Sequence, residues 1–491
     1  MTIRNAPRSP PGGSTLPCGS SPPHRPFRRP HYPLSAAFLK RPQSCLARAA
    51  LLTANLAAVA FFLLSYSHHG VSFGPYHIDL DVYRLGARAW LRGGDLYGHL
   101  PATRAGARLP FTYPPVAAVL LSPFSLVPVT VAATALTLGT IGLLAVVLWV
   151  FHRRLAGPAA GSPWALAWLL PPALFLEPVR DTLGFGQVNV VLMALVSLDC
   201  LVQRPHWPRG ALIGLAAAVK LTPAAFVLFF LVRRDGRAAC TAAVSFAAVT
   251  AIGFAVAWHD SMRYWTGIVF QVGRAGSTQS ASNQSILAVL VRAGLDPRTP
   301  AAIAIWLALS AVAAAVACHG MRQALAASED CLALSLNAFA ALLISPVSWS
   351  HHWVWCAPAL LTLTALGAGR RSRLPLAAAC TGLAIFAAAP QLWLPDGPNA
   401  ELRWAAWQQA IGNSYAIFAA VILLLASSAA MLPARRLTER SRQPAAIRRA
   451  DAVAARIHSP APGQAQSAAS ISPGRSHDGR SPDPALNPPT P

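Results

Sequence analysis

Acidic side chains are scarce in this chain, whose 491 residues include 17 aspartates and glutamates against 40 lysines and arginines. Charged residues make up 12% of the sequence, whereas a soluble domain carries about 25%. Hydrophobic residues make up 54%, and the mean hydropathy is +0.44. The shortage of charge therefore excludes an ordinary soluble domain and places the chain among membrane proteins.

Cysteine pairs and lysine are also in short supply. The eight cysteines include no CxxC pair and lie mostly in or beside apolar runs, which predicts buried free thiols and excludes a disulfide framework or zinc site. Lysine occurs only at Lys40 and Lys220, so the net charge of +23 comes almost entirely from arginine. The arginines gather in two tails and in short loops between apolar runs. This positive-inside pattern argues against nucleic-acid binding.

Apolar runs recur along the middle of the chain at roughly the length that spans a bilayer. Two further segments are irregular: residues 111–128 ("FTYPPVAAVLLSPFSLVP") are short and broken by prolines, and residues 211–232 carry Lys220 and Pro223 near their centre. We predict an all-α polytopic membrane protein with about 10–12 transmembrane helices. The regular runs lie near 46–66, 129–151, 163–178, 186–203, 237–258, 299–319, 331–347, 351–368, 374–390 and 411–432.

The two ends of the chain read as tails. Residues 1–45 and 433–491 are rich in proline, arginine and serine without apolar periodicity, which predicts disordered cytoplasmic tails around a transmembrane domain at 46–432. The first tail is not expected to be a signal peptide, because the apolar run after it is too long and no small-residue cleavage site follows.

The arginine clusters also predict the orientation. If 111–128 does not span and 211–232 returns to the side it came from, every arginine-rich loop falls on the cytoplasmic side of the plasma membrane. The polar and aromatic motifs then lie in outer segments, so we expect chemistry on the outer face. These segments are 67–128, 179–185, 259–298, 348–350 and 391–410, the first of them being the candidate catalytic loop.

The stretch "HIDLDVYRLGARAW" (77–90) opens that loop with two of the few acids. The pattern from Val82 to Leu91 predicts a short amphipathic helix in the membrane interface, with its arginines toward lipid headgroups. Asp79 and Asp81 would precede this helix. An acid at this position can serve as a general base on a hydroxyl; alternatively, one aspartate caps the helix and the other is solvated.

Polar groups at the ends of other runs are further candidates. Gln187 and Asn189 begin a span, where they can bind a sugar or simply cap and cross-link helices. Lys220 lies deep in an apolar segment, which is expensive unless it meets an anion such as a lipid phosphate or snorkels to the interface. His351 and His352 sit among tryptophans in "SPVSWSHHWVW" (345–355); because adjacent residues face different directions, joint metal binding is not expected.

Six short motifs together resemble a known family, the polyprenol-phosphate-sugar-dependent mannosyltransferases of glycosyltransferase family 87, which have the C-type integral-membrane fold. The order and spacing of the motifs match from about residue 75 to 355. They are "DLDVY" (79–83), "FTYPP" (111–115), "GQVN" (186–189), "AVKLTP" (218–223), "NQSI" (283–286) and "SPVSWSHHW" (345–353).

This resemblance implies a mannose donor carried on a polyprenyl phosphate, and a lipid-linked or polymeric mannoside acceptor at the outer face of an actinobacterial membrane. It implies one inverting displacement that forms an α-(1→2) link in cell-envelope lipoglycan biosynthesis. Such chemistry needs one base and a cationic clamp on the leaving phosphate, and it requires no metal or cofactor.

Family positions carry over residue by residue. Asp79 is the favoured base, and one of His351 and His352 supports the phosphate or the reacting hydroxyl. The resemblance implies that Lys220 holds the donor phosphate, with Arg180 or Arg84 as helpers. The candidates for sugar or prenyl contacts are Asp81, Tyr83, Tyr113, Gln187, Asn189, Asn283 and Trp349.

Two other functions compete with this reading. A transporter or flippase of a lipid-linked sugar would share the spans and the buried lysine, but it would usually show inverted repeats with paired broken helices, and only one such segment is visible. A non-catalytic subunit of an envelope-assembly complex would have no need of Asp79.

Overall fold

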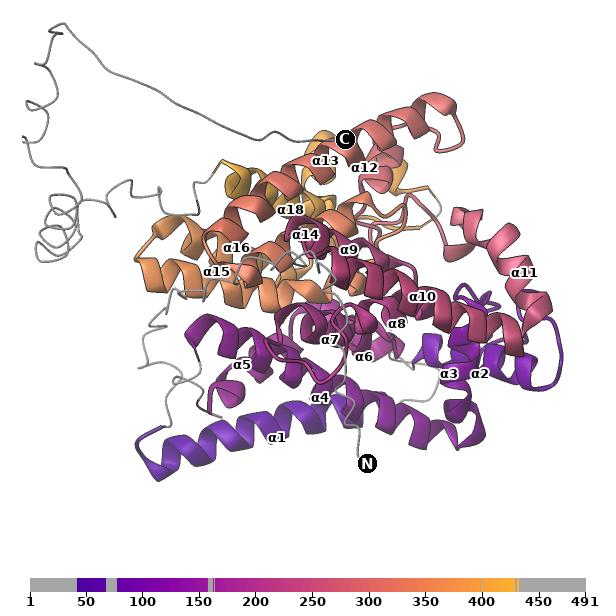
Figure 1. Ribbon diagram of the computed structural model, residues 1–491, viewed down its shortest axis with the longest axis horizontal. Coiled ribbons are helices and arrows are strands. Elements are labelled where there is room, and N and C mark those ends of the chain that lie inside the picture. Colours follow the sequence, from indigo (N-terminus) through magenta and orange to yellow (C-terminus); the bar gives the residue numbers. More distant parts are fainter. Residues whose placement is uncertain are drawn as a thin grey trace, which may run out of the picture. The chain divides into compact units, whose positions relative to one another are not determined.

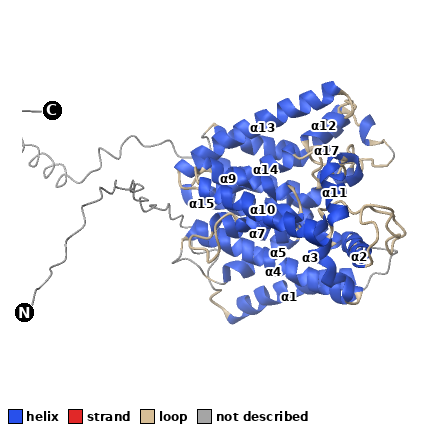
Figure 2. Cartoon of the chain, turned by 45° about the vertical axis from the view of Figure 1, so that its right-hand side comes forward, coloured by secondary structure: helices blue, strands red, loops and turns tan. Residues whose placement is uncertain are grey.

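The computed structural model describes residues 42–67, 77–157, 162, 164–397, 399–428 and 431, all of which belong to one unit of the chain, Met1–Leu432. The described residues form α-helices and short 3-10 helices without a β-strand; a single antiparallel bridge pairs Asn283 with Trp349 (Figures 1 and 2). The predicted all-α class is confirmed. The predicted tails lie outside these residues, apart from 42–45.

Five helices are long and apolar enough to cross a membrane, and two bent pairs raise the number to seven. The predicted runs near 46–66, 129–151, 237–258, 299–319 and 374–390 form the five long ones. Other apolar runs form shorter helices, which is why length alone gives fewer spans than the 10–12 predicted. The long helices are α1 (Cys45–Ser67), α4 (Val129–Ala156), α10 (Gly236–Val256), α13 (Pro300–Ala326) and α16 (Arg373–Ala388), which continues as η6 (Pro390–Trp393).

The bent and short helices complete the bundle. The bent pairs are α6 (Glu177–Phe185) with α7 (Asn189–Leu201), at 120°, and α17 (Ala406–Gly412) with α18 (Ser414–Ser427), at 71°. Further shorter helices are α3 (Pro115–Leu126), α5 (Trp164–Leu174), α14 (Asp330–Ile344) and α15 (Cys356–Arg370). Helices α14 and α15 contribute with α4, α7 and α18 to the main apolar core.

The predicted break in 211–232 is present. Helix α8 (Ala211–Val219) ends at Lys220, whose backbone is extended with φ −150° and ψ 127°. The chain resumes as η2 (Thr222–Phe226) and α9 (Val227–Val232). Pro223 has no amide hydrogen to continue a helical ladder, and its ring crowds the preceding turn. The backbone of Lys220 is therefore extended and not helical.

The amphipathic helix predicted from Val82 is present, but it begins earlier. Helix α2 (Ile78–Leu91) starts right after His77, so Asp79 and Asp81 lie in its first turn and do not precede it. The prediction that its arginines face lipid headgroups is wrong for Arg84, which is 6% exposed and donates to the carbonyl of Val127 at 2.9 Å. Helix α2 packs on α3, and this contact buries the arginine.

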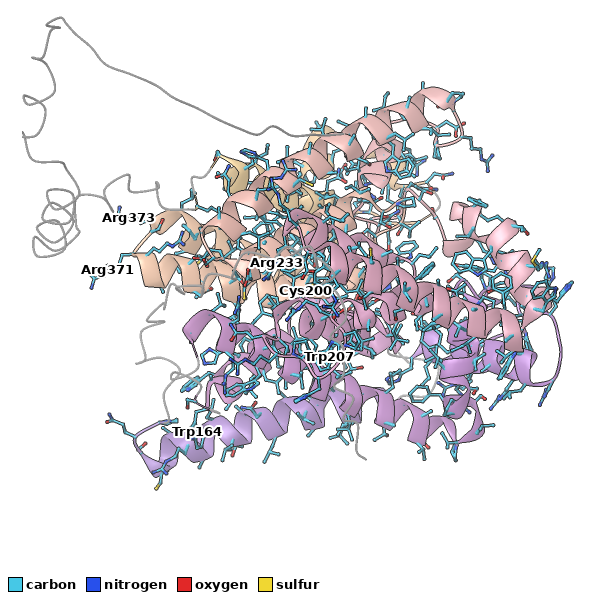
Figure 3. All side chains as sticks on the ribbon, in the orientation of Figure 1. Trp164, Cys200, Trp207, Arg233, Arg371 and Arg373 are labelled. Carbon is cyan, nitrogen blue, oxygen red and sulfur yellow. The ribbon has the colours of Figure 1, made fainter. Side chains whose placement is uncertain are left out.

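The two ends of the bundle differ in character. Figure 2 places α2, α17 and α11 (Trp258–Thr266), with long loops, at one end. At the opposite end, Figure 3 shows Arg371 and Arg373 projecting. The preceding residue, Arg370, pairs with Glu329, and the neighbouring Asp330 pairs with both Arg154 and Arg233. The remaining short elements are η3 (Ile268–Phe270), η4 (Val272–Ala275), α12 (Ile286–Arg292), η5 (Ser350–Trp355) and η7 (Glu401–Arg403).

Close packing of α8 on α10 fixes the position of the Lys220 break. A Cβ added at Gly214 would lie 2.6 Å from Cβ of Ser245 and 2.7 Å from the backbone nitrogen of Phe246. Small residues let membrane helices approach closely in this way. We expect Gly214→Ala to lower the free energy of unfolding by about 1–3 kcal/mol, the usual cost of overpacking, measured as thermal unfolding in detergent.

Gly139 on α4 offers a matched control for that substitution, because an added Cβ there meets nothing within 4 Å. Gly139→Ala should be neutral or stabilise the helix by up to about 1 kcal/mol. Equal unfolding temperatures for the two variants would contradict the close contact of α8 with α10.

Candidate functional site

A cavity of about 560 Å³ opens at the end of the bundle that carries α2 and α11. Its walls come from the start of α2, the "FTYPP" segment, the Lys220 break, η3 with η4, and the segment before η5. Sequence positions far apart therefore meet here. Of the predicted site residues, the cavity is lined by Asp79, Tyr113, Gln187, Lys220, Trp349, His351 and His352.

Asp79 is held at the cavity wall by the turn between α6 and α7. Gly186 ends α6 with φ +69°, and a Cβ there would lie 3.0 Å from the His77 ring, so the turn fits closely against the start of α2. The next residue, Gln187, donates from Nε2 to Oδ2 of Asp79 at 2.8 Å. Burial raises the pKa of Asp79 to about 6, while the Gln187 hydrogen bond and the positive charge of Lys220 act in the opposite direction.

Two tyrosines fix the orientation of the Gln187 amide. Oε1 of Gln187 lies 2.9 Å from the hydroxyl of Tyr83 and 2.9 Å from that of Tyr113, and both can donate to it. Because the oxygen faces the tyrosines, the amide nitrogen faces Asp79. Tyr83 is 1% exposed and lies behind the wall, whereas Tyr113 also lines the cavity. Tyr83 therefore contacts the site only through its neighbours.

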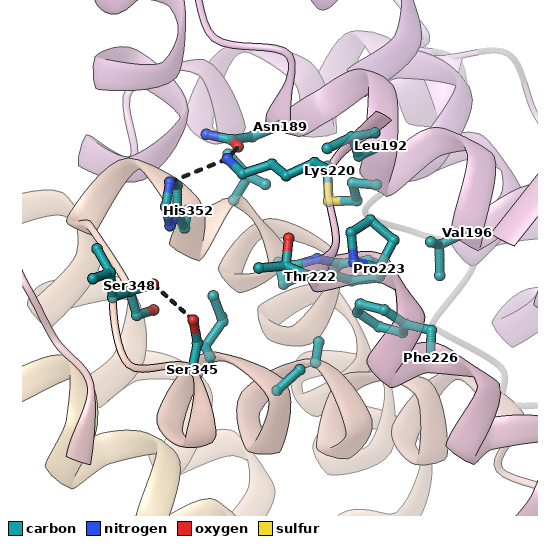
Figure 4. Close-up of a pocket in the computed structure, with 17 residues that line it drawn as sticks. Asn189, Leu192, Val196, Lys220, Thr222, Pro223, Phe226, Ser345, Ser348 and His352 are labelled. Atoms are coloured by element: carbon teal, nitrogen blue, oxygen red, sulfur yellow. Dashed lines mark hydrogen bonds between the residues drawn. The ribbon is translucent and has the colours of Figure 1, made fainter. Parts of the chain in front are cut away.

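Lys220 reaches the cavity from the break between α8 and η2. Its Nζ donates to Oδ1 of Asn189 at 3.0 Å, lies 3.3 Å from Nε2 of His352, and sits 5.4 Å from the centre of the Tyr113 ring. Figure 4 shows the ammonium between the asparagine and the histidine, at the edge of a neighbouring pocket that is also lined by apolar side chains such as Phe226. No carboxylate among the described residues pairs directly with it. The charge is thus available to an anion.

Asn189 and Asn283 act as braces in this geometry. Nδ2 of Asn189 donates to the carbonyl of His351 at 2.9 Å, which leaves its oxygen facing Lys220. Oδ1 of Asn283 accepts from the amide of Ser348 at 2.9 Å, beside the bridge to Trp349. Neither asparagine lines the 560 Å³ cavity. Their contacts position the lysine, the histidines and the tryptophan.

The two histidines share a 3-10 turn. Their rings pack edge to face at 4.8 Å, and the His351 ring lies 5.0 Å from that of Phe185. His352 Nε2 faces an ammonium, so it can accept only as a neutral ring with its proton on Nδ1. The next residue, Trp353, is buried against Phe339, which anchors the turn in the core.

Besides Tyr83 and the two asparagines, three more predicted residues lie outside the cavity lining. Asp81 forms an ion pair with Arg104, 2.9 Å from Nε to Oδ2. Arg84 donates to the carbonyls that end α3, and Arg180 lies 3.7 Å from Asp181. The structure gives these three side chains protein partners away from the cavity.

One cationic residue of the cavity was missed from the sequence. Arg274 lines it and donates from Nη2 to the carbonyl of Tyr97 at 2.7 Å and from Nε to that of Phe111 at 3.4 Å. A lone arginine between Gly273 and Gly276 belongs to none of the six motifs, so only its place in an outer loop could have marked it. Among the described positions, no cluster of three metal-ligating side chains is found.

The cavity combines three kinds of functional group. Asp79 can accept a proton, Lys220 and Arg274 can bind an anion, and Tyr113 and Trp349 offer aromatic faces to a ring or an apolar chain. A base and a cationic clamp in the same cavity suit displacement of a phosphate-linked group by a hydroxyl.

Comparisons with known proteins agree with this chemistry. The model of glycosyltransferase family 87 matches residues 111–346. A polyprenol-phosphate-mannose-dependent alpha-(1-2)-phosphatidylinositol mannoside mannosyltransferase of Mycobacterium tuberculosis is 42% identical over 401 residues, which is 78% of this chain and 92% of the relative. Its namesake in Mycolicibacterium smegmatis is 41% identical over 72% of this chain and 83% of its own length.

A more distant relative in Mycobacterium tuberculosis is a polyprenol-phosphate-mannose-dependent alpha-(1-2)-phosphatidylinositol pentamannoside mannosyltransferase, 33% identical over 67% of this chain and 75% of its own length. No solved structure matches. The resemblance read from the six motifs is confirmed: this chain belongs to glycosyltransferase family 87.

Proposed function

We propose that this glycosyltransferase moves mannose from a polyprenyl-phosphate-mannose donor to a lipid-linked or polymeric mannoside acceptor, forming an α-(1→2) link with inversion. The observation that carries the proposal is the single cavity that holds both Asp79 and the ammonium of Lys220, which forms an ion pair with no carboxylate among the described residues. The mycobacterial relatives, which are named for this donor, sugar and linkage, support all three.

The proposed reaction is one displacement. The acceptor hydroxyl oxygen bonds to the anomeric carbon of mannose while the bond from that carbon to the phosphate oxygen breaks. The hydroxyl proton goes to Asp79, and the bonding electron pair leaves with the polyprenyl phosphate. Lys220, with Arg274, stabilises the charge that develops on the phosphate, and one base suffices because phosphate leaves without protonation.

The remaining lining residues have supporting roles in this proposal. Gln187 holds the carboxylate of Asp79 and, with Tyr113, faces the sugar. Trp349 offers a stacking surface for the sugar or the prenyl chain. His352 contacts Lys220, and His351 has its Nε2 buried without a hydrogen-bond partner among the described residues. One of them supports the phosphate or the reacting hydroxyl.

The location of the arginines supports an active site on the outer face of the plasma membrane. Arg371 and Arg373 lie at the end of the bundle opposite to α2 and α11 (Figure 3). Their neighbour Arg370 pairs with Glu329, and the adjacent Asp330 pairs with Arg154 and Arg233. The positive-inside rule puts this end in the cytoplasm. The cavity then faces outward, where a lipid-linked donor and not a nucleotide sugar is at hand.

Mannose transfer by the purified wild-type protein in liposomes tests the proposed function. Supplied with polyprenyl phosphomannose and a short α-mannoside, it should yield a product lengthened by one residue whose new link is shown by nuclear magnetic resonance to be α-(1→2). If no polyprenyl-linked sugar is transferred while labelled donor moves across the bilayer, the transporter or flippase reading replaces this one.

The raised pKa of Asp79 predicts the acid limb of the reaction. Because the base must be ionised, kcat/KM measured at low donor concentration should fall as the pH drops through about 6. The Gln187 hydrogen bond lowers this pKa, so Gln187→Leu should move the limb to higher pH. Gln323→Leu, a change at a half-buried position on α13, should leave the limb in place. If the acid limb of kcat/KM in Gln187→Leu stays at the wild-type pH, the ionisation of Asp79 does not determine the pH profile.

A further inference from the structure

A second cavity, of about 530 Å³, lies beside the first and has a different chemistry. Its walls are the segment 277–282 and the segment 391–401, which connects α16 to α17. Most of its lining side chains carry hydroxyl, amide or carboxylate groups. The polar ones are Ser277, Gln279, Ser280, Ser282, Gln391, Asp396, Asn399 and Glu401.

Glu401 marks this second cavity as a site built for a ligand. The residue is only 6% exposed, yet its carboxylate has neither a hydrogen bond nor an ion pair with any residue that the structure describes. The guanidinium of Arg292 attracts this carboxylate only through space, so the carboxylate oxygens remain able to accept hydrogen bonds from a ligand in the cavity. Asp396, at the same cavity, is exposed and likewise without an ion pair there. Two carboxylates repel an anion, whereas neighbouring sugar hydroxyls can donate to them.

The walls are fixed before any ligand arrives. Arg292, 2% exposed, donates from Nη1 to the carbonyls of Ser280 at 2.7 Å and Asn283 at 2.9 Å. Its guanidinium also lies 5.8 Å from the centre of the Trp404 ring, and Nε1 of Trp404 donates to the carbonyl of Pro395 at 3.0 Å. One buried arginine thus braces both walls, which spares the ordering cost when a ligand binds.

The two cavities share a wall. Gly276 lines the first and Ser277 the second, and consecutive Cα atoms are only about 3.8 Å apart. Gly276, with φ +121°, leaves room for the Trp349 ring, which would lie 2.8 Å from an added Cβ. The second cavity therefore begins one residue from the lining of the first, next to Trp349.

We propose that the second cavity is an acceptor subsite, which binds sugar residues of the mannoside acceptor beyond the one that carries the reacting hydroxyl. This inference rests on the proposed function. The uncharged hydroxyl-rich surface of such a chain matches the serine, amide and carboxylate lining, and the subsite would give the enzyme a preference for longer acceptors.

Two acceptors of different length test the subsite: methyl α-mannoside, which occupies the first cavity alone, and a methyl α-mannotrioside. The wild type should have a lower KM for the trioside. Asp396→Ala and Glu401→Gln should each raise the trioside KM by about tenfold, as expected for losing a hydrogen bond to a charged group, with kcat nearly kept. Transfer to the one-sugar acceptor should not change. Asp95→Ala, at an exposed carboxylate that lines neither cavity, is the control.

The outcomes separate the two proposals. A wild type that transfers mannose to neither acceptor contradicts the proposed function itself. A wild type that transfers to both without a length preference, or variants that keep the wild-type ratio of the two KM values, overturns the subsite alone. Loss of the preference on adding EDTA would mean that the carboxylates hold a cation, and this too would overturn it.

Discussion

Asp79→Asn strongly slows mannose transfer while donor binding persists: this is the first result we expect. General-base catalysis typically contributes about 10²–10⁴-fold to the rate, so kcat should fall by that factor. The asparagine keeps the size of the side chain, and its oxygen can still accept from Gln187 Nε2, so the wall of the cavity should keep its shape. Initial rates with polyprenyl phosphomannose, and donor affinity by equilibrium binding, measure the two halves of the prediction.

Asp95→Asn provides the matched control for that loss. Asp95 lies in the same segment of the chain and forms an exposed ion pair with Arg263, but it does not line the cavity. Its substitution should leave kcat within about twofold, since exposed ion pairs contribute little. Full activity in Asp79→Asn would remove the aspartate from the role of base, and an equal loss in both variants would point to a general structural effect.

Lys220→Met should weaken donor binding without removing the base that accepts the hydroxyl proton. Methionine has a similar length without the charge, so a phosphate loses its ammonium partner. Hydrogen bonds to charged groups contribute about 1.5–3 kcal/mol, which corresponds to about a 10–150-fold rise in the donor Kd. Binding of polyprenyl phosphomannose to the protein in nanodiscs measures this directly.

Arg373→Met, at an exposed cation on the far end of the bundle, serves as the control for lost charge. Its donor Kd should stay at the wild-type value. An unchanged donor Kd in Lys220→Met would exclude the lysine from the phosphate site, and the ammonium would then need another ligand.

The broken helix and the short "FTYPP" segment were predictable because local chemistry decides them. Pro223 cannot continue a helical ladder, and α3 has 12 residues, about 18 Å of helix, too short for a bilayer core of about 30 Å. The start of α2 was not predictable in the same way. His77 takes a left-handed conformation against the α6 turn, and this tertiary contact sets the first residue of the helix.

In the candidate site, too, residues marked by local chemistry were predictable from the sequence, and residues positioned by tertiary contacts were not. Asp79 and Lys220 stood out because charge in apolar surroundings is costly, and their place in the family motifs added weight. For Asn189 the sequence left a sugar contact and a cross-link between helices as alternatives, because its partners, Lys220 and the carbonyl of His351, come from distant segments. The prediction that Arg84 faces lipid headgroups was wrong because its burial results from the packing of α2 on α3. Arg274 belongs to none of the six motifs, so the sequence did not indicate it.

The proximity of Lys220 to Asp79 has a consequence for the order of events during turnover. In the empty enzyme, the positive charge of the lysine lowers the pKa of the carboxyl. A donor phosphate on the lysine would cancel that charge, so donor binding should raise the pKa and make Asp79 a stronger base. Thermodynamic linkage then requires the donor to bind more tightly as the carboxyl takes up a proton, and the acid limb of kcat should lie at higher pH than that of kcat/KM. The charge of Lys220 and the basicity of Asp79 would thus be coupled, so that donor binding strengthens the base before the acceptor hydroxyl loses its proton.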